Sequence, residues 1–244
     1  MTRDLVRLLV PPGPKGVDRL LPALAAALDG SGPAIAPLPV GPAVPRAYAD
    51  LLEQAVRVDG PPLESEAVAA VVATSGSTGA PKGVLLPAAQ LTSMTAAVHG
   101  AGRPQWVAAL PLTSMGGLNV AVRALAAGRE PIAVDGLAGA GPFTATDFAH
   151  AVTRALRLSD DVRTSLVPTQ LARLLTDDVG VGALKACAQV LVGGAALRAD
   201  LRARARDRGV VVVSTYGATE TSGGAVFDGR PLPGVRVEAD AGGR

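Results

Sequence analysis

Short apolar runs alternate with segments of helical spacing along most of the chain after residue 66. The runs are rich in valine, leucine or alanine, as buried strands are, and cover residues 67–73, 84–86, 106–110, 131–134, 164–167, 189–192 and 210–214. Helices are predicted over residues 88–99, 118–127, 147–156, 170–176 and 198–208. Strands that alternate with helices indicate an α/β fold, here a layered α/β sandwich with mostly parallel strands.

The amino-terminal part of the chain contains more structure-breaking residues. Residues 11–16 and 30–46 are rich in proline and glycine and are predicted to be loops. Residues 17–28 lie between them, have helical spacing and end before an Asp-Gly pair, which is typical of a helix end. A second helix is predicted over residues 46–56.

The most informative segment is a loop rich in glycine and hydroxyl groups, directly after the predicted strand at residues 67–73. It reads Thr-Ser-Gly-Ser-Thr-Gly-Ala-Pro-Lys-Gly over residues 74–83. Glycines let the backbone approach a ligand closely, and successive N–H groups can then bind an anion. Hydroxyls add donors and a lysine adds a compact positive charge. The loop therefore predicts a polyphosphate site that comprises Thr74, Ser75, Gly76, Ser77, Thr78, Gly79 and Lys82.

Two other phosphate-binding motifs do not fit this loop. A Walker A lysine follows a glycine at the start of a helix, whereas Pro81 precedes Lys82, Gly83 follows it and a strand is predicted next. The Rossmann pattern G-x-G-x-x-G is absent. A flexible surface hairpin is the alternative interpretation. The chain has only three lysines, the others being Lys15 and Lys185, so a lysine placed in this loop favours a ligand site.

Two later strand ends carry further candidate residues. The valine-rich strand at 210–214 runs directly into Thr-Tyr-Gly-Ala-Thr-Glu at 215–220. A flat tyrosine ring beside a glycine leaves room for a base, and a glutamate oxygen suits Mg²⁺. Val-Gly-Gly-Ala-Ala-Leu at 192–197 follows another predicted strand. Parallel sheets hold ligands beyond the carboxyl ends of their strands, although each segment alone would be an ordinary turn.

Taken together, the three segments resemble the signature motifs of the adenylate-forming superfamily of acyl-CoA synthetases, luciferases and peptide-synthetase adenylation domains. The resemblance implies that Tyr216 stacks on adenine, Thr219 contacts phosphate and Glu220 binds Mg²⁺. It also implies that Gly193, Gly194 and Ala195 line the adenine and acyl pocket. Thr215 and Gly217 complete the implied ATP-binding set, and the implied catalytic residues are Lys82, Thr219 and Glu220.

Three longer stretches narrow the resemblance to the o-succinylbenzoate–CoA ligases of menaquinone biosynthesis. They are residues 110–120, 165–175 and 220–232. Such enzymes make the CoA thioester of an aromatic dicarboxylate, so the implied cofactors are ATP, Mg²⁺ and coenzyme A as co-substrate. We expect residues 67–244 to form the ATP- and acyl-binding body, with residues 1–66 as an amino-terminal α/β segment packed on it.

The second carboxylate of such an acid needs a polar partner. Arginine binds carboxylates bidentately, which makes Arg123 a candidate, with an arginine on a solvated helix face as the alternative. Ser114 stands where many relatives have a histidine, which leaves another aryl or acyl acid open as the substrate. The predicted substrate-binding set is Ser114, Gly116, Gly117, Arg123 and Thr221.

Composition argues against several other classes of protein. Hydrophobic residues make up 48% and charged residues 18% with a net charge of +2, which is typical of a soluble globular chain. Aromatic residues are 2% and no Lys/Arg run occurs, so a nucleic-acid partner is not expected. Cys187 is the only cysteine, as in a reducing cytoplasm, and its apolar surroundings predict a core residue. No signal peptide or membrane span is expected.

The resemblance also implies a reaction sequence and its partners. The acid attacks the α-phosphate of ATP, pyrophosphate leaves, and the thiol of CoA then attacks the acyl-adenylate. The family also uses a ribose-binding aspartate and a mobile carboxy-terminal domain with a lysine. Nothing after Tyr216 matches either, so we expect nucleotide binding with poor turnover. The expected partners are ATP, an aromatic acid and CoA, with a homodimer left open. A catalytically silent nucleotide-binding module is the remaining alternative.

Overall fold

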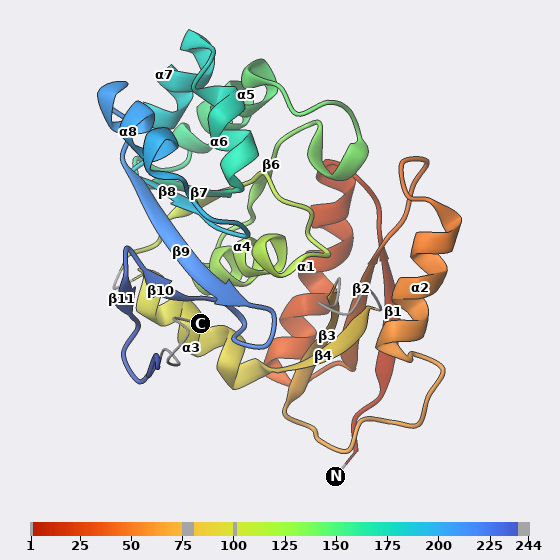
Figure 1. Ribbon diagram of the computed structural model, residues 1–244. Coiled ribbons are helices and arrows are strands. Elements are labelled where there is room, and N and C mark those ends of the chain that lie inside the picture. The colour runs from red at the N-terminus through yellow and green to blue at the C-terminus, as the bar shows by residue number, and fades with distance from the viewer. Residues whose placement is uncertain (1, 75–80, 100–101, 239–244) are drawn as a thin grey trace.

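Two sheets organise the chain, of which the computed structural model describes residues 2–74, 81–99 and 102–238 (Figure 1). The smaller sheet has the order β1-β2-β3-β4, and only β4 runs antiparallel to its neighbour. Its strands are β1 (Leu5–Val10), β2 (Ala34–Pro39), β3 (Val68–Thr74) and β4 (Lys82–Pro87).

The larger sheet has the order β11-β10-β9-β8-β7-β5-β6, and its central part is parallel. Only the pairs that involve β10 are antiparallel. The strands are β5 (Gln105–Ala108), β6 (Ile132–Ala133), β7 (Val162–Leu166), β8 (Gln189–Val192), β9 (Val212–Ala218), β10 (Gly223–Phe227) and β11 (Arg230–Pro231). The predicted α/β fold with mostly parallel strands is confirmed.

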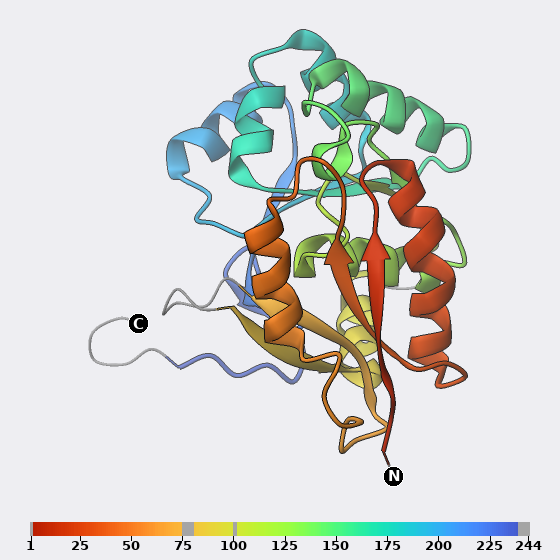
Figure 2. The same ribbon diagram turned by 90° about the vertical axis from the view of Figure 1, so that its right-hand side faces the viewer.

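Three helices fill the space between the two sheets (Figures 1 and 2). They are α1 (Pro14–Asp29), α3 (Ala88–His99) and α4 (Met115–Ala126). Leu20 of α1, Leu86 of β4 and Leu191 of β8 belong to one continuous apolar core, so this middle layer joins the sheets. Each fully buried leucine of this kind contributes about 1.5–3 kcal/mol to folding. The middle layer therefore holds the two sheets together.

The remaining helices cover the outer faces of the sheets. Helix α2 (Arg46–Val56) packs Leu52 and Val56 on the smaller sheet. The larger sheet is covered by α5 (Ala145–Leu156), α6 (Pro168–Leu174), α7 (Asp178–Ala186) and α8 (Ala199–Asp207), and a short 3-10 helix (Leu137–Gly139) follows β6. Within the described residues, none of these helices has the length and apolar character that crossing a membrane requires.

The loop predicted over residues 30–46 is wrong in its middle, where β2 forms. The prolines of β2 favoured a loop in the sequence pattern, because proline cannot donate a backbone hydrogen bond to a sheet. Ala34 N donates to Asp4 O and Val40 N donates to Val10 O, at the two ends of β1. Since donors to one neighbour alternate along a strand, the backbone nitrogens of Pro37 and Pro39 point away from β1. Beyond Ile35, β2 has no paired residue on β3, and the missing donors of the two prolines therefore cost no ladder bond.

Helix α7 was also missed by the sequence pattern. Its Gly180 and Gly182 lower the helix propensity of the segment. The helix forms because Asp177 caps it, its carboxylate accepting from Val179 N at 2.8 Å. The division of the chain at residue 67 stays a prediction. Strands on either side of it, β2 and β3, pair in one sheet.

A buried arginine near the amino terminus ties three segments together. Arg3 is 9% exposed, and its guanidinium donates to the carbonyl oxygens of Ala27 and Gly32, both at 2.7 Å. It also donates to Val68 O at 2.8 Å and to Glu66 O at 3.1 Å. The side chain therefore links the end of α1 to the start of β3.

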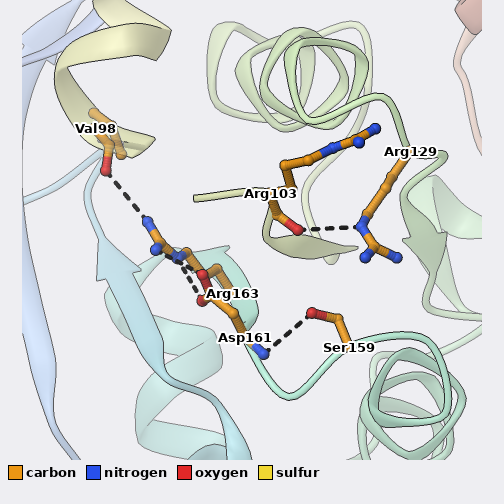
Figure 3. A network of polar contacts seen from close by, with 6 residues as sticks. All are labelled: Val98, Arg103, Arg129, Ser159, Asp161 and Arg163. Carbon is orange, nitrogen blue, oxygen red and sulfur yellow. Dashed lines mark hydrogen bonds and ion pairs between the residues drawn. The ribbon is translucent and has the colours of Figure 1, made fainter. Parts of the chain in front are cut away.

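A second arginine network lies where β5 and β7 begin (Figure 3). Arg163 forms a bidentate pair with Asp161 at 2.7 and 2.8 Å and donates to Val98 O at the end of α3. Arg129 donates to Arg103 O at 3.1 Å. The guanidinium groups of Arg129 and Arg163 thus donate to protein acceptors. The network lies at the opposite end of the strands from the loops at which parallel sheets hold ligands, which indicates a structural role.

Candidate nucleotide and acid site

A cavity of about 440 Å³ lies between α4 and the carboxyl ends of β7, β8 and β9. This is the edge at which parallel sheets hold ligands. It brings together residues from five of the six segments that the sequence singles out, all but the loop at 74–83. The predicted site residues that line the cavity are Ser114, Gly116, Arg123, Gly193, Gly194, Thr215, Gly217 and Thr219.

The geometry of β9 decides which of its residues reach the cavity. Thr215, Gly217 and Ala218 line the cavity, whereas Tyr216 is 75% exposed and lies outside the lining. Thr215 packs tightly against Gly193, where a Cβ would come within 2.2 Å of the threonine Oγ1. Only glycine therefore fits at position 193. Ala195 is exposed and lies outside the cavity lining.

Several predicted polar contacts to the acid are used within the protein. Ser114 caps α4, since its hydroxyl accepts from Gly117 N and donates to Pro111 O at 2.7 Å. Gly117 faces the Pro111 carbonyl rather than the cavity. Thr221 accepts from the backbone of its own turn and donates to Gly223 O at 2.7 Å. Of the predicted substrate-binding set, only Arg123 brings an uncommitted polar side chain to the cavity.

Arg123 is a buried cation without an acidic partner among the described residues. It is 5% exposed, and its guanidinium carbon lies 5.3 Å from the centroid of the Trp106 ring. One terminal nitrogen is 3.5 Å from Ser165 Oγ, and Nε has no hydrogen-bond partner. Burial lowers the pKa of Arg123 to about 10, so the side chain stays charged at neutral pH. Such a group favours an anionic ligand.

The phosphate loop is only partly described, because Ser75, Gly76, Ser77, Thr78 and Gly79 lie outside the described residues. The residues that flank it, Thr74 and Lys82, are cross-strand partners of β3 and β4. Thr74 Oγ1 donates to Lys82 O at 3.5 Å, and the lysine side chain is exposed. Neither residue lines the 440 Å³ cavity.

Glu220 lies in the turn between β9 and β10 with its side chain exposed. Within the described segments no group of three or more His, Cys, Asp or Glu residues is arranged for a metal ion. Mg²⁺ in nucleotide sites takes one or two carboxylates together with phosphate oxygens and water. An exposed carboxylate one residue beyond the cavity lining therefore fits Mg²⁺ that would arrive with ATP.

A second cavity, of about 610 Å³, meets the first at Pro111 and Ser114. It is bounded by the ends of β1 and β2 and by α2, and its lining is mostly apolar. The sequence pattern did not predict this cavity, nor Ser165 and Asn119 in the first one. Asn119 lies four residues before Arg123, a spacing that places both on one helix face and would have identified it.

Cys187 takes no part in this site, and its titration provides a test. Its Sγ lies 3.5 Å from Ala183 O, and burial raises the thiol pKa to about 12. The unfolded chain loses this proton at lower pH than the folded chain does, so stability falls as the pH rises from about 9 towards 12. We expect thiolate absorbance of the folded chain only near the upper limit, and near pH ~9 in urea. Cys187→Ala provides the baseline, and equal titration in both states would contradict the burial.

Similarity to known proteins agrees with the geometry. The model of the AMP-binding enzyme family matches residues 29–242. The chain is 42% identical over 242 residues to a probable 2-succinylbenzoate–CoA ligase of Mycobacterium tuberculosis strain H37Rv, covering 98% of this chain and 59% of that protein. It is 32% identical over 179 residues to the 2-succinylbenzoate–CoA ligase of Escherichia coli K12, covering 68% of this chain and 35% of that protein. The chain thus spans about three fifths or less of these relatives.

Solved structures share the fold. The o-succinylbenzoate coenzyme A synthetase of Bacillus subtilis, in complex with ATP and magnesium ion, superimposes with a TM-score of 0.67 at 20% identity, covering 99% of this chain and 57% of that one. The amino-terminal subdomain of Klebsiella oxytoca NpsA, in complex with 3-hydroxyanthranilyl-AMSN, gives 0.69 at 18% identity, covering 93% and 62%. With two of its three motifs gathered at one sheet edge and the family match over most of its length, the chain belongs to the AMP-binding enzyme family.

Proposed function

We propose that this chain is the ATP- and acid-binding body of a cytoplasmic ligase that activates o-succinylbenzoate. The observation that carries the proposal is the buried Arg123 in the cavity wall, without a carboxylate partner among the described residues. A dicarboxylic acid can direct one carboxylate to ATP and leave the other for this guanidinium. The 2-succinylbenzoate–CoA ligase names of the relatives support the same acid.

The nucleotide side of the site follows from the motifs. Gly193 and Gly194 line the cavity in which the adenylate would lie, and Thr219 would contact its phosphate. The exposed ring of Tyr216 offers a face to the adenine, and Glu220 would hold Mg²⁺, which neutralises phosphate charge during the transfer. Lys82 and the hydroxyls of the 74–83 loop would hold the outer phosphates. The protein thus acts by positioning the acid against the α-phosphate and by stabilising charge.

The 610 Å³ cavity is proposed to receive the pantetheine arm of CoA. A long, mostly uncharged arm matches an apolar lining. The junction at Pro111 and Ser114 would let the thiol approach the acyl-adenylate from the second cavity. Poor turnover by this chain alone stays a prediction, and a homodimer has no supporting contact among the described residues.

A different aryl acid is the alternative substrate. The Klebsiella subdomain holds a 3-hydroxyanthranilyl compound on the same fold, and Ser114 departs from the histidine that many relatives have. An acid of that kind carries no second carboxylate, so it would leave Arg123 unpaired. A buried charge without an anionic partner costs free energy, which favours the dicarboxylate as the substrate.

A thermal-shift titration tests the proposal directly. A ligand present at ~100 times its Kd stabilises a fold by ~2.7 kcal/mol, which is about 5–10 °C for a chain of this size. We expect such a shift with a stable o-succinylbenzoyl-adenylate mimic and a smaller one with a benzoyl-adenylate mimic. Equal shifts would support the family site but not the dicarboxylate, and no shift with either mimic or with Mg·ATP would contradict the site.

A further inference from the structure

The turn that carries Glu220 has two backbone hydrogen bonds of its own, of which the one from Thr221 N to Ala218 O is long at 3.3 Å, and the Thr221 hydroxyl adds further contacts. It joins β9 to β10, and Ser222 N donates to Thr219 O at 2.9 Å. Ser222 has a φ of 55° and Gly223 a φ of 95°, so the backbone passes through the left-handed region twice in succession. Left-handed residues other than glycine are held in place by their surroundings. The contacts of this turn therefore decide where the Glu220 carboxylate lies.

Asn119 of α4 makes one of those contacts. Its side-chain amide donates to Ser222 O at 2.8 Å and is buried, with the residue 3% exposed. The packing is close, because a Cβ on Gly223 would lie 2.1 Å from the Asn119 amide nitrogen. Asn119 also lines the cavity one helical turn before Arg123. The turn is thus bound to α4, the helix that forms one wall of the 440 Å³ cavity.

Gln90 of α3 makes the matching contact on the other side of Thr221. Its side-chain amide donates to the backbone oxygen of Glu220 itself, at 3.0 Å. Helix α3 follows directly after β4, the strand that begins at Lys82. The carbonyls of Glu220 and Ser222, on either side of Thr221, are therefore held by side-chain amides from two helices, α3 and α4.

We infer that Gln90 and Asn119 are positioning residues, a two-amide clamp that orients the Glu220 carboxylate towards the Mg²⁺ of Mg·ATP. The inference rests on the proposed function, since Mg·ATP is the ligand that needs this carboxylate. Without the clamp the backbone at Glu220 can move relative to the cavity that Thr219 lines. The loss then falls on metal-dependent binding and leaves metal-free nucleotide binding unchanged.

Calorimetric titration of the whole chain with ATP, in Mg²⁺ and in EDTA, separates these effects. The variants are Gln90→Met and Asn119→Leu, which remove the amide and keep much of the side-chain volume. We expect each to weaken Mg·ATP binding about tenfold, the scale of one lost hydrogen bond. Gln90 lies outside the cavity lining, so Gln90→Met should leave the binding of ATP in EDTA unchanged. Gln54→Met is the matched control, because Gln54 is an exposed glutamine of α2. Gln90 is only half-buried, so its variant tests the clamp even if Asn119→Leu unfolds.

Asn119 is the only asparagine in the chain, so asparagine labelled with nitrogen-15 gives one side-chain amide signal pair. We expect this pair to shift further on addition of Mg·ATP than on addition of ATP in EDTA. If the wild type binds Mg·ATP and both variants bind it equally well, only the clamp is overturned. The same holds if Gln90→Met weakens the binding of ATP in EDTA as much as the binding of Mg·ATP. If wild type binds no nucleotide in either buffer, the proposed function fails and the clamp fails with it.

Discussion

Arg123→Met is expected to weaken binding of an o-succinylbenzoyl-adenylate mimic by about a hundredfold. A hydrogen bond from a charged group contributes about 1.5–3 kcal/mol, and 1.4 kcal/mol corresponds to a factor of ten in affinity. The upper part of that range applies because Arg123 is 5% exposed and water cannot replace the lost contact. Methionine fills a similar space without charge, and calorimetric titration measures the two dissociation constants.

The matched ligand and the stability of the variant make this test specific. A benzoyl-adenylate mimic lacks the second carboxylate, so its affinity should change little in Arg123→Met. The variant should also unfold at the same or a higher temperature, since it removes a buried charge without an acidic partner. Arg123→Lys keeps the charge but lacks the planar fork, and we expect an intermediate loss. An equal loss with both mimics would mean that Arg123 supports the cavity wall and not the acid.

Local sequence pattern predicts most of this fold for a physical reason. Helix α3 and strand β8 have the predicted bounds, because each is a short apolar segment between clear breaks. Strand β2 was not predicted because its prolines are tolerated only where no hydrogen bond from their nitrogens is needed. Whether such a bond is needed depends on how β1 and β3 pair with β2. That information lies in the tertiary arrangement and not in the segment itself.

The candidate site, like the fold, could be predicted from the sequence only in part. Residue type and order identify the segments that meet at the cavity, as Gly193 and Thr215 illustrate. Which side chains remain free for a ligand depends on distant partners. Ser114 and Thr221 have suitable hydroxyls but use them on the backbone, whereas Arg123 is buried without an acidic partner among the described residues and stays the candidate for the acid. The contact from Asn119 to Ser222 spans 103 positions and has no local signal.

Arg3→Met is expected to lower the free energy of unfolding by about 3 kcal/mol, a large part of the stability of a typical domain. Arg3 donates to Ala27 O, Gly32 O, Val68 O and Glu66 O, and methionine would leave these carbonyls without that donor. Part of the effect comes from the end of α1, where the helix dipole favours a cation near Ala27 O. The melting temperature should fall by about 6–12 °C, measured by circular dichroism.

Arg7→Met is the matched control for this prediction, since it makes the same substitution a short distance along the chain. Arg7 pairs with Glu53 at 3.3 Å and with Asp59 at 3.6 Å, and its side chain is 39% exposed. Ion pairs at that exposure contribute about 0–1 kcal/mol, so the control should melt close to the wild type. The difference between the two variants isolates burial, because charge and side-chain length change equally in both. If Arg3→Met melts no lower than Arg7→Met, the carbonyls around Arg3 find water instead, and the link between α1 and β3 contributes little to stability.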